Sequence, residues 1–65
     1  MFSILVRKAE SGRCSYRVSH IRPERRGSDT TVWALDGTLP LDDNAPARYA
    51  LAGALRHLAD EIEAS

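Results

Sequence analysis

Apolar residues recur with a short period over the first third of the chain. Segment 2–8 (FSILVRK) is short and rich in β-branched and aromatic residues, and turn-forming residues follow it at 10–12. Segment 14–21 alternates in part between apolar and polar positions, which is the period of a half-buried strand. One side of this second segment carries Cys14, Tyr16 and Val18. The pattern therefore predicts two antiparallel strands joined by a turn.

The middle of the chain interrupts this pattern and then resumes it. Segment 22–29 holds a proline, a glycine and five charged residues, which predicts a long, mobile, charged loop. Segment 30–35 predicts a third strand. The Asp36-Gly37 pair after it is a strong hairpin signal, because both central positions of a type I′ turn need positive φ. Segment 38–41 would then return as a short fourth strand, and Pro40, which lacks an amide donor, would confine that strand to an edge.

From about Pro46 to Glu63 the period lengthens to that of a helix. Asp42 and Asp43 precede this segment, where carboxylates favour the helix dipole, and Asn44 is a candidate capping residue. The apolar residues fall on one stripe of a helical projection, which is typical of an amphipathic helix packed on a core. That stripe consists of Ala47, Leu51, Ala54, Leu55, Leu58 and Ile62.

The order of these elements predicts an α+β fold in one small domain over residues 1–65. A three- or four-stranded antiparallel sheet would be followed by one C-terminal helix (βββα or ββββα), and the helix would pack across one face of the sheet. The face toward the helix would carry Phe2, Ile4, Val6, Tyr16 and Val18. The open face would carry Leu5, Arg7, Arg13, Arg17 and Ser19, with Trp33 a further candidate.

Length and composition limit what such a domain can hold. A chain of 65 residues buries only about 60% of the surface that it exposes when unfolded, which leaves little material for an enclosed pocket. With 43% apolar and 28% charged residues, the composition is that of a folded protein. The single cysteine, Cys14, can form neither an internal disulfide nor a thiolate zinc site, and we expect it to be a small buried hydrophobe.

Two further properties of the sequence bear on where the protein is found. No apolar run is long enough to cross a bilayer, and residues 1–7 lack the layout of a signal peptide, so we expect a cytoplasmic protein. Eight arginines against one lysine, together with nine alanines, favour a GC-rich bacterial or phage genome.

Few residues in the chain are suited to catalysis. His57 and Glu61 are four residues apart on the predicted helix and could both reach one metal ion. Such pairs are common by chance on an exposed helix face, and a solvated charged face is the interpretation we favour. No glycine-rich phosphate loop, nucleophile elbow or paired-carboxylate cleft is recognisable. We therefore expect no catalytic residue, metal site, cofactor or small-molecule substrate, and hence not an enzyme.

The formal net charge is zero, but its distribution is uneven. Residues 1–28 carry seven basic and two acidic side chains, whereas residues 29–65 carry two basic and seven acidic ones. Basic residues on a sheet face and a neighbouring loop could contact phosphates, with Tyr16 or Trp33 available for stacking. This nucleic-acid alternative would use Arg7, Arg13, Arg17, Arg22, Arg25 and Arg26. The order of elements also resembles the three-stranded, one-helix DNA-binding modules of plant transcription factors, which implies nucleic-acid binding without assigning a role to any residue.

The outer face of the helix favours a protein partner instead. An aromatic residue and small residues lie there, where a solvated helix would normally show Glu, Lys and Gln, and a glycine inside a helix costs about 1 kcal/mol relative to alanine. This predicted partner face consists of Tyr49, Ala52, Gly53, Arg56 and Asp60. The leading prediction is a small regulatory or inhibitory protein-binding module, whose partner is another protein or a second copy of itself.

Overall fold

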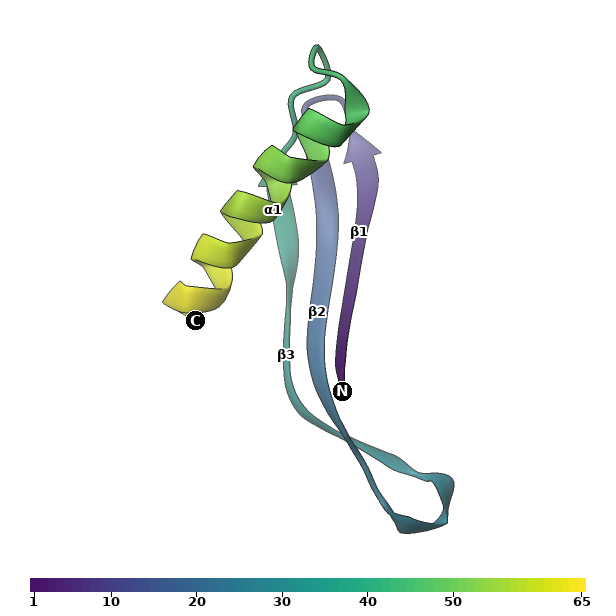
Figure 1. Ribbon diagram of the computed structural model, residues 1–65. Helices are drawn as coiled ribbons and strands as arrows, with labels where there is room; N and C mark the ends of the chain where they lie inside the picture. The colour runs from purple at the N-terminus through teal and green to yellow at the C-terminus, as the bar shows by residue number, and fades with distance from the viewer.

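A three-stranded antiparallel sheet and one C-terminal helix make up the fold (Figure 1). The computed structural model describes the backbone of residues 1–65 and every side chain except that of Arg26. Strands β1 (Phe2–Glu10), β2 (Arg13–Pro23) and β3 (Asp29–Pro40) lie in the order β1-β2-β3, and α1 (Ala47–Ala64) follows. The predicted βββα order is thereby confirmed. The helix begins and ends within a residue of its predicted bounds.

Strands β1 and β2 form the first hairpin. Their register pairs Phe2 with His20 and Val6 with Tyr16. Gly12 in the connecting turn has a φ of 77°, a conformation that glycine adopts without steric cost. Alternation then puts every second residue of β2 on the face toward the helix, as the sequence predicted for Tyr16 and Val18.

The expected hairpin at Asp36-Gly37 is wrong. β3 runs through both residues to Pro40, and Gly37 pairs with Tyr16. A Cβ atom at position 37 would lie 3.0 Å from Tyr16 Oη and 3.2 Å from two ring carbons. The glycine therefore makes room for the buried tyrosine ring and does not form a turn, and no fourth strand exists within the described chain. Pro40 is the last residue of an edge strand, where a missing donor is tolerated.

The predicted loop over 22–29 is shorter than expected. β2 and β3 stay paired as far as Pro23 and Asp29, and the 3₁₀ turn η1 (Arg25–Gly27) closes the hairpin. One extra residue, Val32, shifts the register between the pairs His20–Trp33 and Ile21–Thr31. We call residues 21–32 the distal arm, because they extend beyond the start of β1 (Figure 1).

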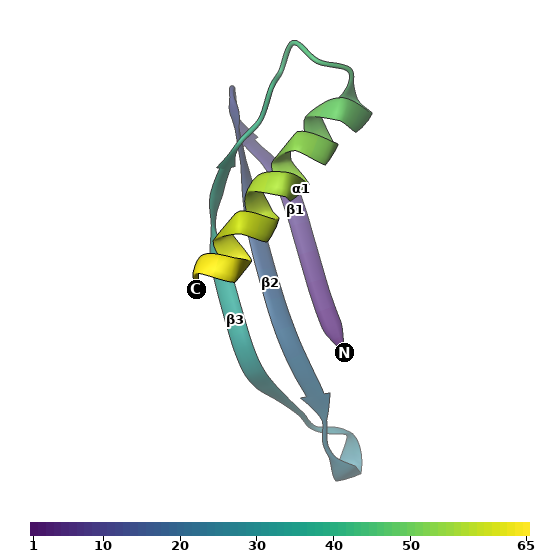
Figure 2. The same ribbon diagram turned by 60° about the vertical axis from the view of Figure 1, so that its left-hand side comes forward.

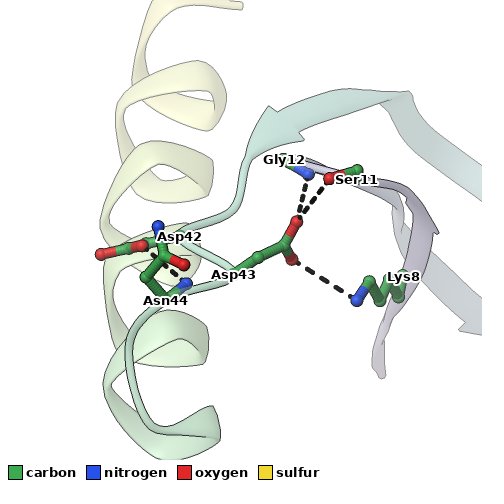
Figure 3. Close-up of polar contacts among 6 residues, drawn as sticks. All are labelled: Lys8, Ser11, Gly12, Asp42, Asp43 and Asn44. Carbon is green, nitrogen blue, oxygen red and sulfur yellow. Dashed lines mark hydrogen bonds and ion pairs between the residues drawn. The ribbon is translucent and has the colours of Figure 1, made fainter.

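The connection from β3 to α1 is fixed by two aspartates (Figure 3). Asp42 accepts a hydrogen bond from the Asn44 amide at 3.0 Å. Asp43 accepts hydrogen bonds from the Gly12 amide and the Ser11 hydroxyl, and its other oxygen lies 3.5 Å from Lys8 Nζ. These contacts lower the pKa of the Asp43 carboxyl, the backbone hydrogen bond most of all. Asn44 does not cap the helix as expected, because Pro46 occupies the N-cap position.

The core is small and lies between α1 and the strands β2 and β3. It consists of Cys14, Tyr16, Val18, Leu39, Ala54 and Leu58, so Cys14 is buried as expected. Several residues assigned to the core by the sequence are exposed instead: Phe2, Ile4, Ala47, Leu51 and Leu55. Trp33, a candidate for the open face, pairs with His20 on the helix side and packs partly buried against the core.

Candidate protein interface

An apolar surface runs along β1 and the adjoining flank of α1. We call it the β1–α1 surface and define it by Phe2, Ile4, Val6, Leu51 and Leu55. Phe2 is 74% exposed, Ile4 59% and Leu55 42%. Val6 and Leu51 line a common hollow of about 310 Å³ between β1 and the first turns of α1. Leu55 lies one turn beyond Leu51 on the same flank of the helix.

The direction and width of the helix explain why four of these five side chains are exposed and Val6 is only partly buried. α1 crosses the sheet obliquely, from the β1–β2 turn toward β3, and leaves the first half of β1 without a helix above it (Figure 2). A helix about 10 Å wide covers roughly two strands that lie about 4.8 Å apart. Since α1 contacts β3, β1 is the strand left outside.

The backbone of β1 is also open along its outer edge. Met1 and Ile21 exchange two backbone hydrogen bonds, of 2.8 and 2.9 Å. In an antiparallel ladder such pairs alternate with pairs that do not bond, so Ser3, Leu5 and Arg7 point their amides and carbonyls toward β2. The backbone groups of Phe2, Ile4, Val6 and Lys8 consequently point outward. Their side chains lie on the helix side of the sheet.

The molecule as a whole exposes more surface than its mass predicts. A compact monomer of 7.2 kDa is expected to expose about 4,100 Å², whereas this chain exposes 5096 Å². Its radius of gyration is 13.9 Å, against about 11 Å for a compact domain of this length. The distal arm and the β1–α1 surface both contribute to the difference.

The predicted partner face forms one continuous side of α1, and partner binding by this face stays a prediction. Tyr49 and Gly53 line a hollow of about 300 Å³ with Pro40 and His57, on the β3 side of the helix. The Arg48 guanidinium lies 4.8 Å from the Tyr49 ring centroid. A Cβ atom at Gly53 would meet nothing within 4 Å. Ala52, Arg56 and Asp60 follow on the outward side of the same helix.

Three of the predicted phosphate-binding arginines come together and the others do not. Arg7, Arg13 and Arg17 share the face of the sheet opposite the helix, and Arg13 donates a 2.7 Å hydrogen bond to the Thr38 hydroxyl. Arg22 and Arg25 lie in the distal arm, where Arg22 pairs with Glu24 at 2.9 Å. The side chain of Arg26 lies outside the described part of the structure.

The aromatic residues expected to stack on bases are not on the arginine-bearing face. Tyr16 is buried beneath the helix, and Trp33 lies on the helix side of the sheet. Phe2 is also on that side, 4.9 Å from the His20 ring. Burial raises the pKa of the Tyr16 hydroxyl, and the nearby carboxylates of Glu61 and Asp36 raise it further. Neither the Tyr16 ring nor the Trp33 ring therefore lies beside the arginines of the open face.

The described part of the chain shows no metal site and no membrane-spanning helix. Within the described residues, no three His, Cys, Asp or Glu side chains are grouped so that they could hold a metal ion. α1, the one α-helix of the part that the structure describes, is not apolar enough to cross a membrane.

Sequence reasoning missed the β1–α1 surface because it assigned these residues to the core, against which only Val6 packs, partly buried. Alternation showed correctly that Ile4 and Val6 face the helix side, but it carries no information on how far the helix reaches. One signal was present in the sequence: three strands face a single helix, and one helix is too narrow to cover them all.

Comparisons with family models, with curated proteins and with solved structures found no match to this chain.

Proposed function

We propose that this protein is a small non-enzymatic regulatory or inhibitory binding module that contacts a protein chain, either another protein or a second copy of itself, through the β1–α1 surface. The observation that carries the proposal is the exposure of Phe2, Ile4 and Leu55. The core of the molecule is formed by other residues on the same face of the sheet and on the same helix. Monomeric proteins rarely expose contiguous apolar patches of more than a few hundred Å², and larger ones mark interaction sites.

The chemistry of this surface suits a protein partner. Its side chains are apolar, and Lys8, a charged residue of β1 on the same face of the sheet, forms an ion pair with Asp43. A partner that covers the surface would remove apolar area from water, which is the main driving force of protein association. An outward row of amides and carbonyls along β1 adds directional contacts for a second strand.

A pair of matched variants tests this proposal. Ile4→Asp puts a charge in the β1–α1 surface, and Val32→Asp puts the same charge at a similarly exposed valine of the distal arm. Tagged parent and variants are compared in pull-downs, both from host extract and with an untagged copy. We expect the parent and Val32→Asp to retain the same associations and Ile4→Asp to lose them. Associations that Ile4→Asp keeps, or a parent with none, would contradict the proposal.

A second candidate function is nucleic-acid binding by the open face of the sheet. The observation in its favour is that Arg7, Arg13 and Arg17 share a face that no helix covers. With the aromatic residues elsewhere, contacts there would be to phosphates, and binding would weaken steeply with salt. Gel shifts at low and moderate salt test this: Arg17→Ala should weaken binding to all sequences alike. A parent protein that shifts neither duplex nor single strand at low salt would eliminate the candidate.

A further inference from the structure

We infer that the partner on the β1–α1 surface is a second copy of this chain. The β1 strands of the two copies pair antiparallel about a two-fold axis and join the two sheets into one of six strands. This inference rests on the proposed function, since it names the occupant of the same surface. Three observations carry it: the outer edge of β1, the uneven covering of its side chains and the excess exposed area.

The outer edge of β1 is complementary to itself. Its outward amides and carbonyls belong to Phe2, Ile4, Val6 and Lys8, at a regular spacing of two residues. An antiparallel pair exchanges both hydrogen bonds between facing residues of this kind. Two copies of one such edge therefore satisfy each other under two-fold symmetry, the commonest symmetry of protein dimers.

The opposite edge of the sheet, formed by β3, is less suited to pairing with another strand. The outward residues of β3 are Ala34, Asp36 and Thr38, and the strand ends at Pro40. Charged residues and proline on an edge strand are devices that prevent strands from pairing there. β1 has neither between Phe2 and Val6.

Antiparallel pairing also brings the uncovered side chains together. It sets the first half of β1 in one copy beside the second half of β1 in the partner copy. That second half lies under the start of the partner copy's own helix. Phe2 and Ile4 of one copy then lie next to the flank of the other copy that carries Leu51 and Leu55. The helix of each copy would thus cover the apolar side chains of β1 that the helix of the other copy leaves exposed.

The excess exposed area of the chain is similar to the area that one subunit buries in a dimer interface. The chain exposes roughly 1,000 Å² more than a compact monomer of its mass. A standard protein interface buries about 800 Å² on each partner. An interface along β1 and the flank of α1 would thus account for much of the excess, and the distal arm contributes the rest.

Sedimentation equilibrium with two proline variants tests the pairing. Ile4→Pro removes an amide that points away from β2, and Ala34→Pro removes the equivalent outward amide at the β3 edge. Neither change breaks a hydrogen bond within the sheet. We expect the parent and Ala34→Pro to sediment at twice the 7.2 kDa chain mass and Ile4→Pro to sediment as a single chain. A dimer that survives Ile4→Pro would overturn the β1 pairing.

Amide hydrogen exchange of the unmodified protein gives a second measurement that needs no variant. The amides of Ser3, Leu5 and Arg7 bond to β2 and should be protected at every protein concentration. The outward amides of Ile4 and Val6 should be protected only at concentrations where the chain sediments as a dimer, and should lose that protection on dilution. Fast exchange of Ile4 and Val6 in a dimeric sample would overturn the inference.

The outcomes separate this inference from the proposed function. A parent that sediments as a single chain at all concentrations overturns the inference. If Ile4→Asp then still abolishes capture of a different protein that Val32→Asp retains, the β1–α1 surface keeps its proposed function with another partner. If Ile4→Asp leaves that capture unchanged, the inferred dimer and the proposed function of the β1–α1 surface are both wrong.

Discussion

β1 and β3 are the two edge strands of one sheet, and both direct apolar side chains toward the side on which α1 lies. On β3, Leu39 is 1% exposed beneath the helix, whereas on β1, Ile4 is 59% exposed. The residue types are similar and the alternation is the same, so the difference arises from the path of α1. A side chain can therefore face the core side of a sheet and still lie on the surface of the monomer.

The largest expected effect contrasts one substitution on each edge strand. Leu39→Ala should lower the free energy of unfolding by about 2 to 5 kcal/mol, as large-to-small changes in a core do. Ile4→Ala should lower that of the single chain by less than about 1 kcal/mol, because most of the side chain is already in water. Urea denaturation at concentrations where the chain is monomeric measures both. Equal losses at the two positions would show that β1 is covered after all.

A second prediction concerns the covered half of the sheet. Gly37→Ala places a methyl group against the buried Tyr16 ring and should destabilise the protein by about 1 to 3 kcal/mol, the usual range for overpacking. The same urea titrations measure this change. The control is Gly53→Ala, in which the new methyl group meets nothing. An unchanged or increased stability of Gly37→Ala would mean that Tyr16 moves aside and that the close approach is not a constraint.

A smaller effect on stability is expected at Asp43, which connects the segment before α1 to the β1–β2 turn through hydrogen bonds and an ion pair. The folded state lowers the pKa of this carboxyl below its ordinary value of 3.8. Its contribution to stability is thus fully present above about pH 4 and is lost as the pH falls through the lowered pKa. Asp43→Asn should be less stable than the parent at neutral pH, and the difference should shrink in acid. Thermal melts of both proteins over a pH series measure it; a difference that does not vary with pH would show that the charge has no role.

The smallest expected effect on stability is that of a substitution at Gly53, on the side of the helix away from β1. Gly53→Ala should raise the free energy of unfolding by up to about 1 kcal/mol through helix propensity alone and leave self-association unchanged. Denaturation and sedimentation of the same sample check both. If the variant loses an association that the parent makes, the sequence-based partner face around Tyr49 and Gly53 takes part in binding, and β1 is not the sole contact region.

Local pattern determined much of this protein. Residue composition and partial alternation identified the three strands, the third only as far as residue 35. The period-3.6 segment identified α1 to within a residue of its ends, because side-chain periodicity follows directly from backbone geometry. The same alternation placed Tyr16 and Val18 under the helix and Arg7 and Arg17 on the opposite face. Each of these properties depends on residues close together in the chain.

The tertiary structure alone decided the rest. Asp36-Gly37 has the local chemistry of a turn, but the Tyr16 ring packed over Gly37 makes it part of a strand. The extra residue Val32 sets the register that turns Trp33 toward the helix side. The exposure of Ile4 and Leu55 follows from where an 18-residue helix crosses a sheet that is wider than the helix itself. All three depend on contacts between segments distant in sequence, which periodicity along the chain does not encode.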